Sequence, residues 1–170
     1  MRLAGKVAVI VGAGQSPGEG LGNGRATALR FAREGAKVLA VDKNLASAEE
    51  TAALVRAEQG DCVAFAADVT QEATLAAAIA AALKRWGRVD ILDNNVGVSL
   101  AGGDTPLAEL TEEAFDRVSA INLRGTIMAC KHALPIMRQQ RAGAIINISS
   151  IAAWCNYPTV AYKATKAAMI

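Results

Sequence analysis

With 170 residues, 52% of them hydrophobic and 20% charged, the chain has the composition of a compact fold, which excludes intrinsic disorder. The length suits one domain, so we expect a single domain over residues 1–170. A net charge of +2 gives no sign of a surface for nucleic acid or for anionic membranes, and we expect neither as a partner.

The cysteines and the N-terminal residues indicate neither a disulfide-rich or metal-binding protein nor a secreted or membrane-spanning one. Cys62, Cys130 and Cys155 are far apart and odd in number, so neither a disulfide framework nor a metal site is expected. The first apolar run, at residues 7–11, is too short for a signal sequence or a membrane span. A cytoplasmic location is the default expectation.

Short apolar, β-branched runs alternate with segments of helical composition along the chain. The runs predict five strands, at residues 7–11, 37–41, 62–66, 89–92 and 144–148. The segments between them predict helices at residues 24–34, 46–59 and 71–86 and a long helical stretch at 112–140. Because parallel neighbours need long crossovers, this alternation favours an α/β fold, a doubly wound parallel sheet with helices on both faces.

A glycine-rich turn separates the first strand from the first helix. It carries Gly12, Gly14, Gly22 and Gly24, with Asn23 between the last two. Glycines let a backbone approach a pyrophosphate closely, and the following helix offers unpaired N–H groups and the positive end of its dipole. The turn therefore predicts a dinucleotide site, although a plain flexible loop would have the same composition and the spacing G-x-G-x-x-G does not occur.

Acidic residues follow the second and third strands. A carboxylate at Asp42 can accept hydrogen bonds from both ribose hydroxyls of an adenosine and would repel a 2′-phosphate, which indicates NAD rather than NADP. The alternative is a solvated Asp that caps the helix after Asn44. Asp68 can likewise serve as the N-cap of the helix that follows it.

Tyr162 and Lys166 are four residues apart, which places a phenol and an ammonium on one face of a helix. A phenol titrates at about pH 10 in water, so its use as an acid or base near neutral pH requires the phenolate to be stabilised by about 4 kcal/mol. A neighbouring cation has the right sign for this effect. Without context the pair would be an exposed helix contact, but two serines, Ser149 and Ser150, end the fifth strand just before it.

The cofactor motifs resemble those of the short-chain dehydrogenase/reductase family, whose glycine loop reads T-G-x-x-x-G-x-G. Here Val11 replaces the Thr, and an insertion precedes the closing glycines at 22 and 24. Asp68-Val69 resembles the family's pair that borders the adenine, and residues 94–97 resemble its Asn-Asn-Ala-Gly stretch on the cofactor side of the sheet. Asp93 departs from the family, which has an apolar or neutral residue at this strand end. The resemblance implies further cofactor contacts from Asn95, Val96 and Gly97.

The catalytic residues that the resemblance implies are, in the family's order, Asn122, Ser150, Tyr162 and Lys166. Tyr162 would be the general acid/base, Lys166 would support its phenolate and hold the nicotinamide ribose, and Asn122 would anchor a water beside the lysine. Ser150 is the second serine of its pair, which is the usual catalytic one, whereas the commonest spacing to the tyrosine selects Ser149. Both remain candidates, because adjacent strand residues face opposite ways.

The resemblance covers essentially the whole chain and implies a Rossmann-like oxidoreductase that transfers a hydride between a nicotinamide cofactor and an alcohol or ketone. The implied partners are a small alcohol or carbonyl substrate and further copies of the chain, in a dimer or tetramer. The family has two strands more than the five predicted here, so we expect the domain to be incomplete at its C-terminal end. A methyltransferase and a nucleotide-binding module without activity are the rival interpretations, and the Ser, Tyr and Lys set argues against the first.

Overall fold

The computed structural model describes residues 1–16, 18 and 20–170, and five parallel strands form its single sheet. The strands are β1 (Val7–Val11), β2 (Lys37–Asp42), β3 (Cys62–Ala66), β4 (Ile91–Asn94) and β5 (Ala144–Asn147). Their order across the sheet is β3-β2-β1-β4-β5. The order reverses between β1 and β4, and ligands of open α/β sheets bind beside such a reversal, at the carboxyl ends of the strands.

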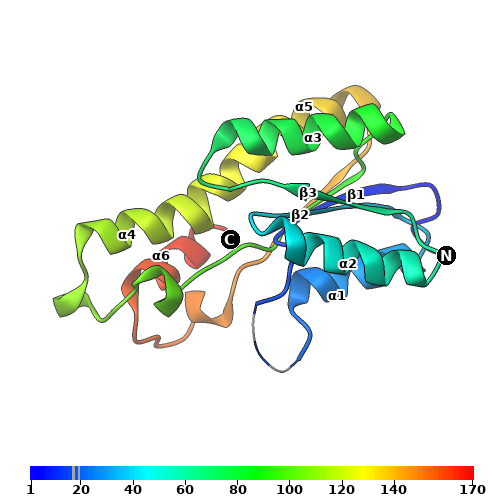
Figure 1. Cartoon of the computed structure of the whole chain (residues 1–170). Helices are drawn as coiled ribbons and strands as arrows, with labels where there is room; N and C mark the ends of the chain where they lie inside the picture. The colour runs from blue at the N-terminus through cyan, green and yellow to red at the C-terminus, as the bar shows by residue number, and fades with distance from the viewer. Residues whose placement is uncertain (17, 19) are drawn as a thin grey trace.

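Helices cover both faces of the sheet, which confirms the predicted doubly wound α/β fold (Figure 1). One face carries α1 (Asn23–Arg33) and α2 (Leu45–Ala57), and the other carries α3 (Glu72–Trp86) and α5 (Gly125–Gln140). Two shorter helices, α4 (Glu112–Ser119) and α6 (Val160–Ala167), pack against each other beyond the carboxyl ends of the strands. In the part of the chain that is described, no helix is both long and apolar enough to cross a membrane.

The strands are near-continuous apolar runs because each face of the sheet is buried under helices. In β1, Val9 faces the core formed with α3 and α5, whereas Ile10 faces the core formed with α1 and α2. Each buried Val or Ile side chain contributes about 1.5 to 3 kcal/mol of transfer free energy. Alternating side chains of one strand therefore hold both helix layers.

Most predicted boundaries agree with the structure to within one or two residues, and two regions differ for a structural reason. The fourth strand runs over Ile91–Asn94 rather than over residues 89–92, and its start is later because the backbone N–H and carbonyl of Val89 bond to the Gln140 side chain instead of to a neighbouring strand. The long helical stretch at 112–140 is interrupted by a π-helical turn, η3 (Ala120–Arg124), between α4 and α5. The composition of this stretch predicts a helix but does not reveal a π-helical turn. The turn widens the helix at Asn122, whose side chain is buried.

Asp93, predicted at the end of a strand, lies inside β4 between Ile10 of β1 and Ile146 of β5. Its side chain shares the sheet face of Ile10, and the residue is only 1% exposed. Among the described residues neither carboxylate oxygen has a hydrogen-bond partner. Burial raises the pKa of this carboxyl from 3.8 to about 6. Above that pH the folded strand holds a buried negative charge, which lowers the stability of the fold.

We predict that Asp93→Val stabilises the protein at pH 8. In the native wild-type chain the carboxyl keeps its proton up to about pH 6, whereas in the unfolded chain it loses it near 3.8, so its stabilising contribution is present below the lower value and is lost as pH rises through the higher one. Two pKa units correspond to about 3 kcal/mol. Urea unfolding of the wild type and of Asp93→Val between pH 4 and pH 8 measures the free energy of unfolding of both. We expect Asp93→Val to be the more stable of the two at pH 8.

Asp90→Asn is the matched control, because Asp90 is also buried but has partners. Burial opposes its ionisation, yet the hydrogen bonds from the Arg88 guanidinium and Val7 N, with Lys6 nearby, outweigh burial and lower the pKa. Asp90→Asn should therefore destabilise the protein at neutral pH and lose this effect in acid. If Asp93→Val also destabilised the protein at pH 8, the description of Asp93 as an unpaired charge would be wrong.

Candidate active site

The glycine turn after β1 packs tightly against the loop after β4. Gly12 has a φ of +90°, and a Cβ on this residue would lie 2.8 Å from Val96 Cγ2. A Cβ on Gly24, in the first turn of α1, would lie 1.9 Å from the carbonyl oxygen of Gly12. Asn95 Nδ2 donates to that same oxygen at 3.4 Å. Only glycine fits at 12 and 24, so the predicted residues Gly12, Gly24, Asn95 and Val96 form one packed unit.

The rest of the turn is held by hydrogen bonds to its own side chains and to the end of β2. Gly14 N donates to Asp42 Oδ2 at 3.0 Å, and a Cβ on Gly14 would lie 2.6 Å from that oxygen. Gly22 N, just before Asn23 begins α1, donates to Gln15 Oε1 at 2.7 Å. Pro17 and Glu19, within the inserted segment, lie outside the described residues. The glycines predicted at both ends of the insertion therefore occupy defined positions.

A buried polar cluster behind the turn was not predicted. Thr51 Oγ1 donates to Ala13 O at 2.7 Å and accepts from Arg25 Nε at 2.9 Å, while Ser47 Oγ accepts from Gln15 N at 2.7 Å. These side chains fasten the turn to α2. In the sequence they are ordinary polar helix residues, and only the fold brings α1 and α2 together behind the turn.

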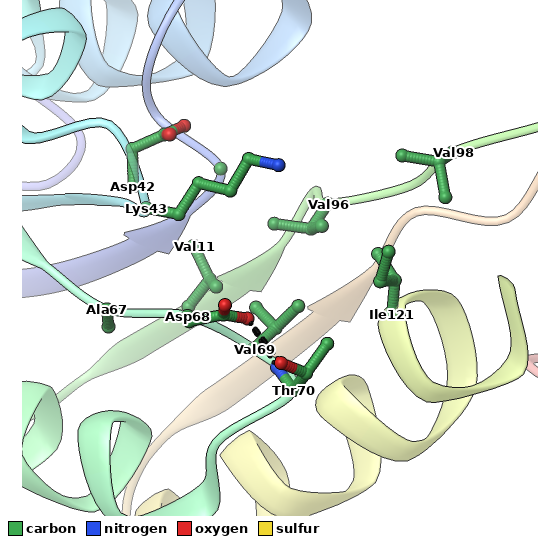
Figure 2. Close-up of a pocket in the computed structure, with 11 residues that line it drawn as sticks. Val11, Asp42, Lys43, Ala67, Asp68, Val69, Thr70, Val96, Val98 and Ile121 are labelled. Atoms are coloured by element: carbon green, nitrogen blue, oxygen red, sulfur yellow. Dashed lines mark hydrogen bonds between the residues drawn. The ribbon is translucent and has the colours of Figure 1, made fainter. Parts of the chain in front are cut away.

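A cavity of about 170 Å³ opens at the carboxyl ends of the central strands, beside the glycine turn (Figure 2). Asp42 lies on one wall, and Asp68 and Val69 lie on another. Its other lining residues are Val11, Gly12, Lys43, Ala67, Thr70, Val96, Val98 and Ile121. The cavity thus joins predicted residues from four segments of the chain with several that were not predicted, notably Lys43 and Ile121.

The two acidic residues of the cavity do not cap helices. The N-cap of α2 is Asn44, whose side chain accepts from Ser47 N, while Asp42 accepts from Gly14 N and, through Oδ1, from Asn44 N. Each Asp42 oxygen keeps capacity for a further hydrogen bond. The N-cap role that the sequence also allows for Asp68 is not found, because the N-cap of α3 is Gln71.

Asp68 instead closes the turn before α3. Its Oδ1 accepts hydrogen bonds from the backbone N–H of Thr70 at 2.8 Å and from the Thr70 hydroxyl at 2.7 Å. These two bonds hold the pKa of the carboxyl below its ordinary value. The carboxylate therefore remains ionised at neutral pH and faces the cavity as an acceptor (Figure 2).

Tyr162 and Lys166 lie on one face of α6, as predicted from their spacing. The Lys166 side chain is deeply buried, with Nζ 5.7 Å from the centroid of the Tyr162 ring. Its ammonium donates to Ile148 O at 2.6 Å, and burial lowers its pKa from the ordinary value. A Cβ on Gly97 would lie 3.0 Å from Nζ, so the glycine leaves room for the ammonium.

Asn122 links the loop after β4 to α6. It is fully buried, and its amide oxygen accepts from Val98 N at 2.8 Å. Its amide nitrogen donates to Val98 O at 2.9 Å and to Thr165 Oγ1 at 3.1 Å. The side chain therefore binds protein groups on two elements and fixes the distance between them.

The two serines that end the strand segment have different hydrogen bonds. Ser149 Oγ donates to Lys166 O at 2.6 Å, so its proton is committed to α6. Ser150 Oγ accepts from Ala152 N at 3.1 Å, at the start of the short 3₁₀ helix η4 (Ile151–Ala153). Ser150 thereby keeps its hydroxyl proton for another acceptor. Of the aromatic residues nearby, Tyr157 packs against the Tyr162 ring at 5.7 Å between centroids, whereas Trp154 is largely exposed.

A glycine turn that meets a helix N-terminus at the reversal of strand order, with an acid at the end of the neighbouring strand, is the arrangement found in doubly wound α/β proteins that bind dinucleotides. A profile of the short chain dehydrogenase family matches residues 6–170. The chain belongs to the short-chain dehydrogenase/reductase family.

Named relatives are dehydrogenases and reductases. The chain is 37% identical over 167 residues to 2-(R)-hydroxypropyl-CoM dehydrogenase of Xanthobacter autotrophicus, which covers 97% of this chain and 64% of that protein. It is 41% identical over 174 residues to sorbitol dehydrogenase of Cereibacter sphaeroides, across 100% of this chain and 62% of that protein.

Solved structures show the same fold. A Burkholderia xenovorans protein described as a short-chain dehydrogenase/reductase superposes with a TM-score of 0.90 and 45% identity, over 99% of this chain and 66% of that one. A 7α-hydroxysteroid dehydrogenase in complex with NADH and 7-oxo glycochenodeoxycholic acid gives 0.88 and 32% identity, over 98% and 62%. The chain therefore spans less than two thirds of the length of these proteins.

Proposed function

We propose that the protein is an NAD-dependent oxidoreductase that interconverts an alcohol and a ketone, with Tyr162 as general acid/base. The observation that carries this proposal is the pairing of Tyr162 with the buried ammonium of Lys166, next to Ser149 and Ser150. The chain's membership of a family of oxidoreductases supports it.

The described residues fit a nicotinamide cofactor. Gly12, Gly14 and Gly24 leave no room for side chains at the turn, which would let the backbone and the start of α1 approach a pyrophosphate. The cavity beside the turn offers two carboxylates and an apolar wall for an adenosine. The cofactor would be held by Asp42, Asp68, Val69 and the loop at residues 95–97. When bound, it would supply the donor or acceptor for hydride transfer.

The proton is handled by the chain's own residues. In alcohol oxidation the Tyr162 phenolate takes the hydroxyl proton of the substrate, and in ketone reduction the phenol returns it. The Lys166 ammonium stabilises the phenolate electrostatically, and this effect is strong because the ammonium is 2% exposed. Asn122 keeps α6 at a fixed distance from the loop after β4, and so keeps both groups in place.

Ser150 orients the substrate oxygen. Its Oγ accepts from Ala152 N, so the hydroxyl proton can be donated to the oxygen that Tyr162 also contacts. Ser149 would instead have to give up its bond to Lys166 O. We therefore assign the substrate contact to Ser150 and a structural role to Ser149.

Asp42 would select NAD over NADP, because a carboxylate repels a 2′-phosphate and accepts from ribose hydroxyls. Lys43 lies beside it on the cavity wall and has the opposite preference. We give Asp42 the larger effect, since its position is fixed by the bonds from Gly14 N and Asn44 N. NADH is present in the complex of the related 7α-hydroxysteroid dehydrogenase.

The substrate we propose is a small molecule with a secondary alcohol or a carbonyl group. The relatives are named for chemically diverse substrates, among them sorbitol, levodione and D-threitol. Further copies of the chain are the other partner we propose, because α4 and α5 expose apolar side chains. These include Phe115, Ile127 and Leu134.

In a chain with a complete C-terminus, Tyr162→Phe should lower kcat by about 10² to 10⁴-fold, the usual contribution of a general acid or base, and should leave NADH binding nearly unchanged. Turnover of NAD with a panel of secondary alcohols gives kcat, and NADH fluorescence gives the Kd. Tyr157→Phe is the control, since it removes a phenol from the adjacent ring only. A Tyr162→Phe protein with near-normal kcat would overturn the assignment.

The two serines should separate in a pair of alanine variants. Ser150→Ala removes the donor to the substrate oxygen, and we expect a loss of about 10²-fold or more in kcat with little loss of stability. Ser149→Ala removes a bond to Lys166 O, and we expect a stability loss of about 1 kcal/mol with a smaller change in kcat. Steady-state kinetics and urea unfolding of both variants test this, and the reverse result would assign catalysis to Ser149.

Asp42→Ala should narrow the difference between the affinities for NADH and NADPH. In the unmutated protein NADH should bind more tightly, because the carboxylate repels the 2′-phosphate of NADPH. Fluorescence titration with both cofactors measures the two Kd values, and Lys43→Ala should change the ratio in the opposite direction. Tighter binding of NADPH by the unmutated protein would refute the NAD assignment.

A further inference from the structure

Asp104 lies in the loop between β4 and α4, yet its carboxylate binds the start of α6. It is 1% exposed. Oδ1 accepts from Ala161 N at 3.0 Å, and Oδ2 accepts from Tyr162 N at 2.8 Å. The second of these bonds spans 58 residues of sequence and ends on the backbone of Tyr162 itself.

Helix α6 depends on this carboxylate because it has no side-chain cap of its own. The first N–H groups of a helix have no partner within the helix, and the N-cap residue Thr159 does not supply one. Asp104 pairs two of these groups and places a negative charge at the positive end of the helix dipole. Burial opposes ionisation of Asp104, but the bonds from the Thr159 hydroxyl and from the N–H groups of α6 outweigh it and lower the pKa.

The loop that carries Asp104 is itself held in place. Asp104 N donates to Ser99 O at 3.2 Å, and Arg117 of α4 donates to Gly102 O at 3.4 Å. Gly103 has a φ of +88°, and a Cβ on Gly102 would lie 2.8 Å from Val98 Cγ2. These contacts brace the loop on α4, so the carboxylate has little freedom to follow α6 if the helix moves.

We propose that Asp104 is a positioning residue, which fixes Tyr162 relative to Lys166 and Ser150 by binding the backbone of the tyrosine. The proposal rests on the function proposed for Tyr162. Asp104 holds the N-terminal turn of α6, while Asn122 holds its middle through Thr165. Both bonds come from the segment between β4 and α5, so this segment sets the place of the helix. A displacement of about 1 Å at a reacting group can cost 10²-fold in rate.

Asp104→Asn tests the proposal with little change in size. The amide keeps one acceptor oxygen but turns a donor toward a backbone N–H, so one of the two bonds is lost and the charge is removed. We expect kcat to fall by about 10 to 10²-fold, with the Kd for NADH nearly unchanged, because the cavity beside the glycine turn does not include Asp104. If this variant does not fold, Asp104→Glu takes its place, since it keeps the carboxylate but moves it by one methylene group relative to the N–H groups of Ala161 and Tyr162.

The control is Asp90→Asn, which also removes a buried carboxylate that binds a backbone N–H, but at the opposite end of the strands. Both variants should be less stable than the wild type. Only Asp104→Asn should lower kcat when both proteins are assayed fully folded, as judged by circular dichroism. Equal kcat values in the two variants would overturn the proposal and leave Asp104 with a structural role.

Amide hydrogen exchange separates this proposal from the proposed function. In Asp104→Asn the amides of Ala161 and Tyr162 should exchange faster than in the wild type, and in Asp90→Asn they should not. If the unmutated protein, supplied with the C-terminal residues that complete the domain, showed no turnover, the oxidoreductase function would be refuted, and the exchange rates would then decide whether Asp104 anchors Tyr162. Unchanged exchange at Tyr162 in Asp104→Asn would refute the anchoring whatever the activity.

Discussion

The parallel pairing of β1 with β4 determines where everything else in the molecule can lie. Val11 pairs with Asn94, so the glycine turn after β1 and the loop after β4 leave the sheet side by side. The close approach of Gly12 to Val96 is possible because these two segments leave adjacent strands at the same edge of the sheet. The loop after β4 then carries Val98 and Asp104 to the helix of Tyr162. A single strand pair thus connects the cavity beside the glycine turn to the segment that positions Tyr162 and Lys166.

Three buried aspartates show that the hydrogen-bond and charge partners of a carboxylate determine whether burial raises or lowers its pKa. Asp90 and Asp104 are as inaccessible as Asp93, yet cations or N–H groups surround the first two and lower their pKa values. Asp93 has no such partner among the described residues, and its pKa is raised. The two partnered carboxylates each join distant parts of the chain. Burial alone therefore does not indicate which acidic residues stabilise this fold.

Local patterns in the sequence predicted the strands and the order of the elements, because a buried parallel strand requires an unbroken apolar run. They also placed Tyr162 and Lys166 on one face of a helix. They could not predict the bond of Asp104 to Tyr162 or the cluster of Arg25 and Thr51, since each joins polar residues that only the fold brings together. The predicted end of the fourth strand, at residue 92, was too early because Asp93 and Asn94 are polar, which does not indicate a buried strand, yet both lie within the sheet. Family resemblance, rather than spacing, singled out Asn122.

Gln15 gives the inserted glycine segment a property of its own. Its side-chain oxygen accepts a hydrogen bond from Gly22 N, and this bond joins the two ends of the insertion. Ser47 secures the Gln15 backbone on the other side. The positions of the flanking glycines are therefore fixed by these bonds and do not depend on the length of the chain between Gln15 and Gly22. We therefore expect the insertion to accept a change of length while these two bonds keep the flanking glycines in place.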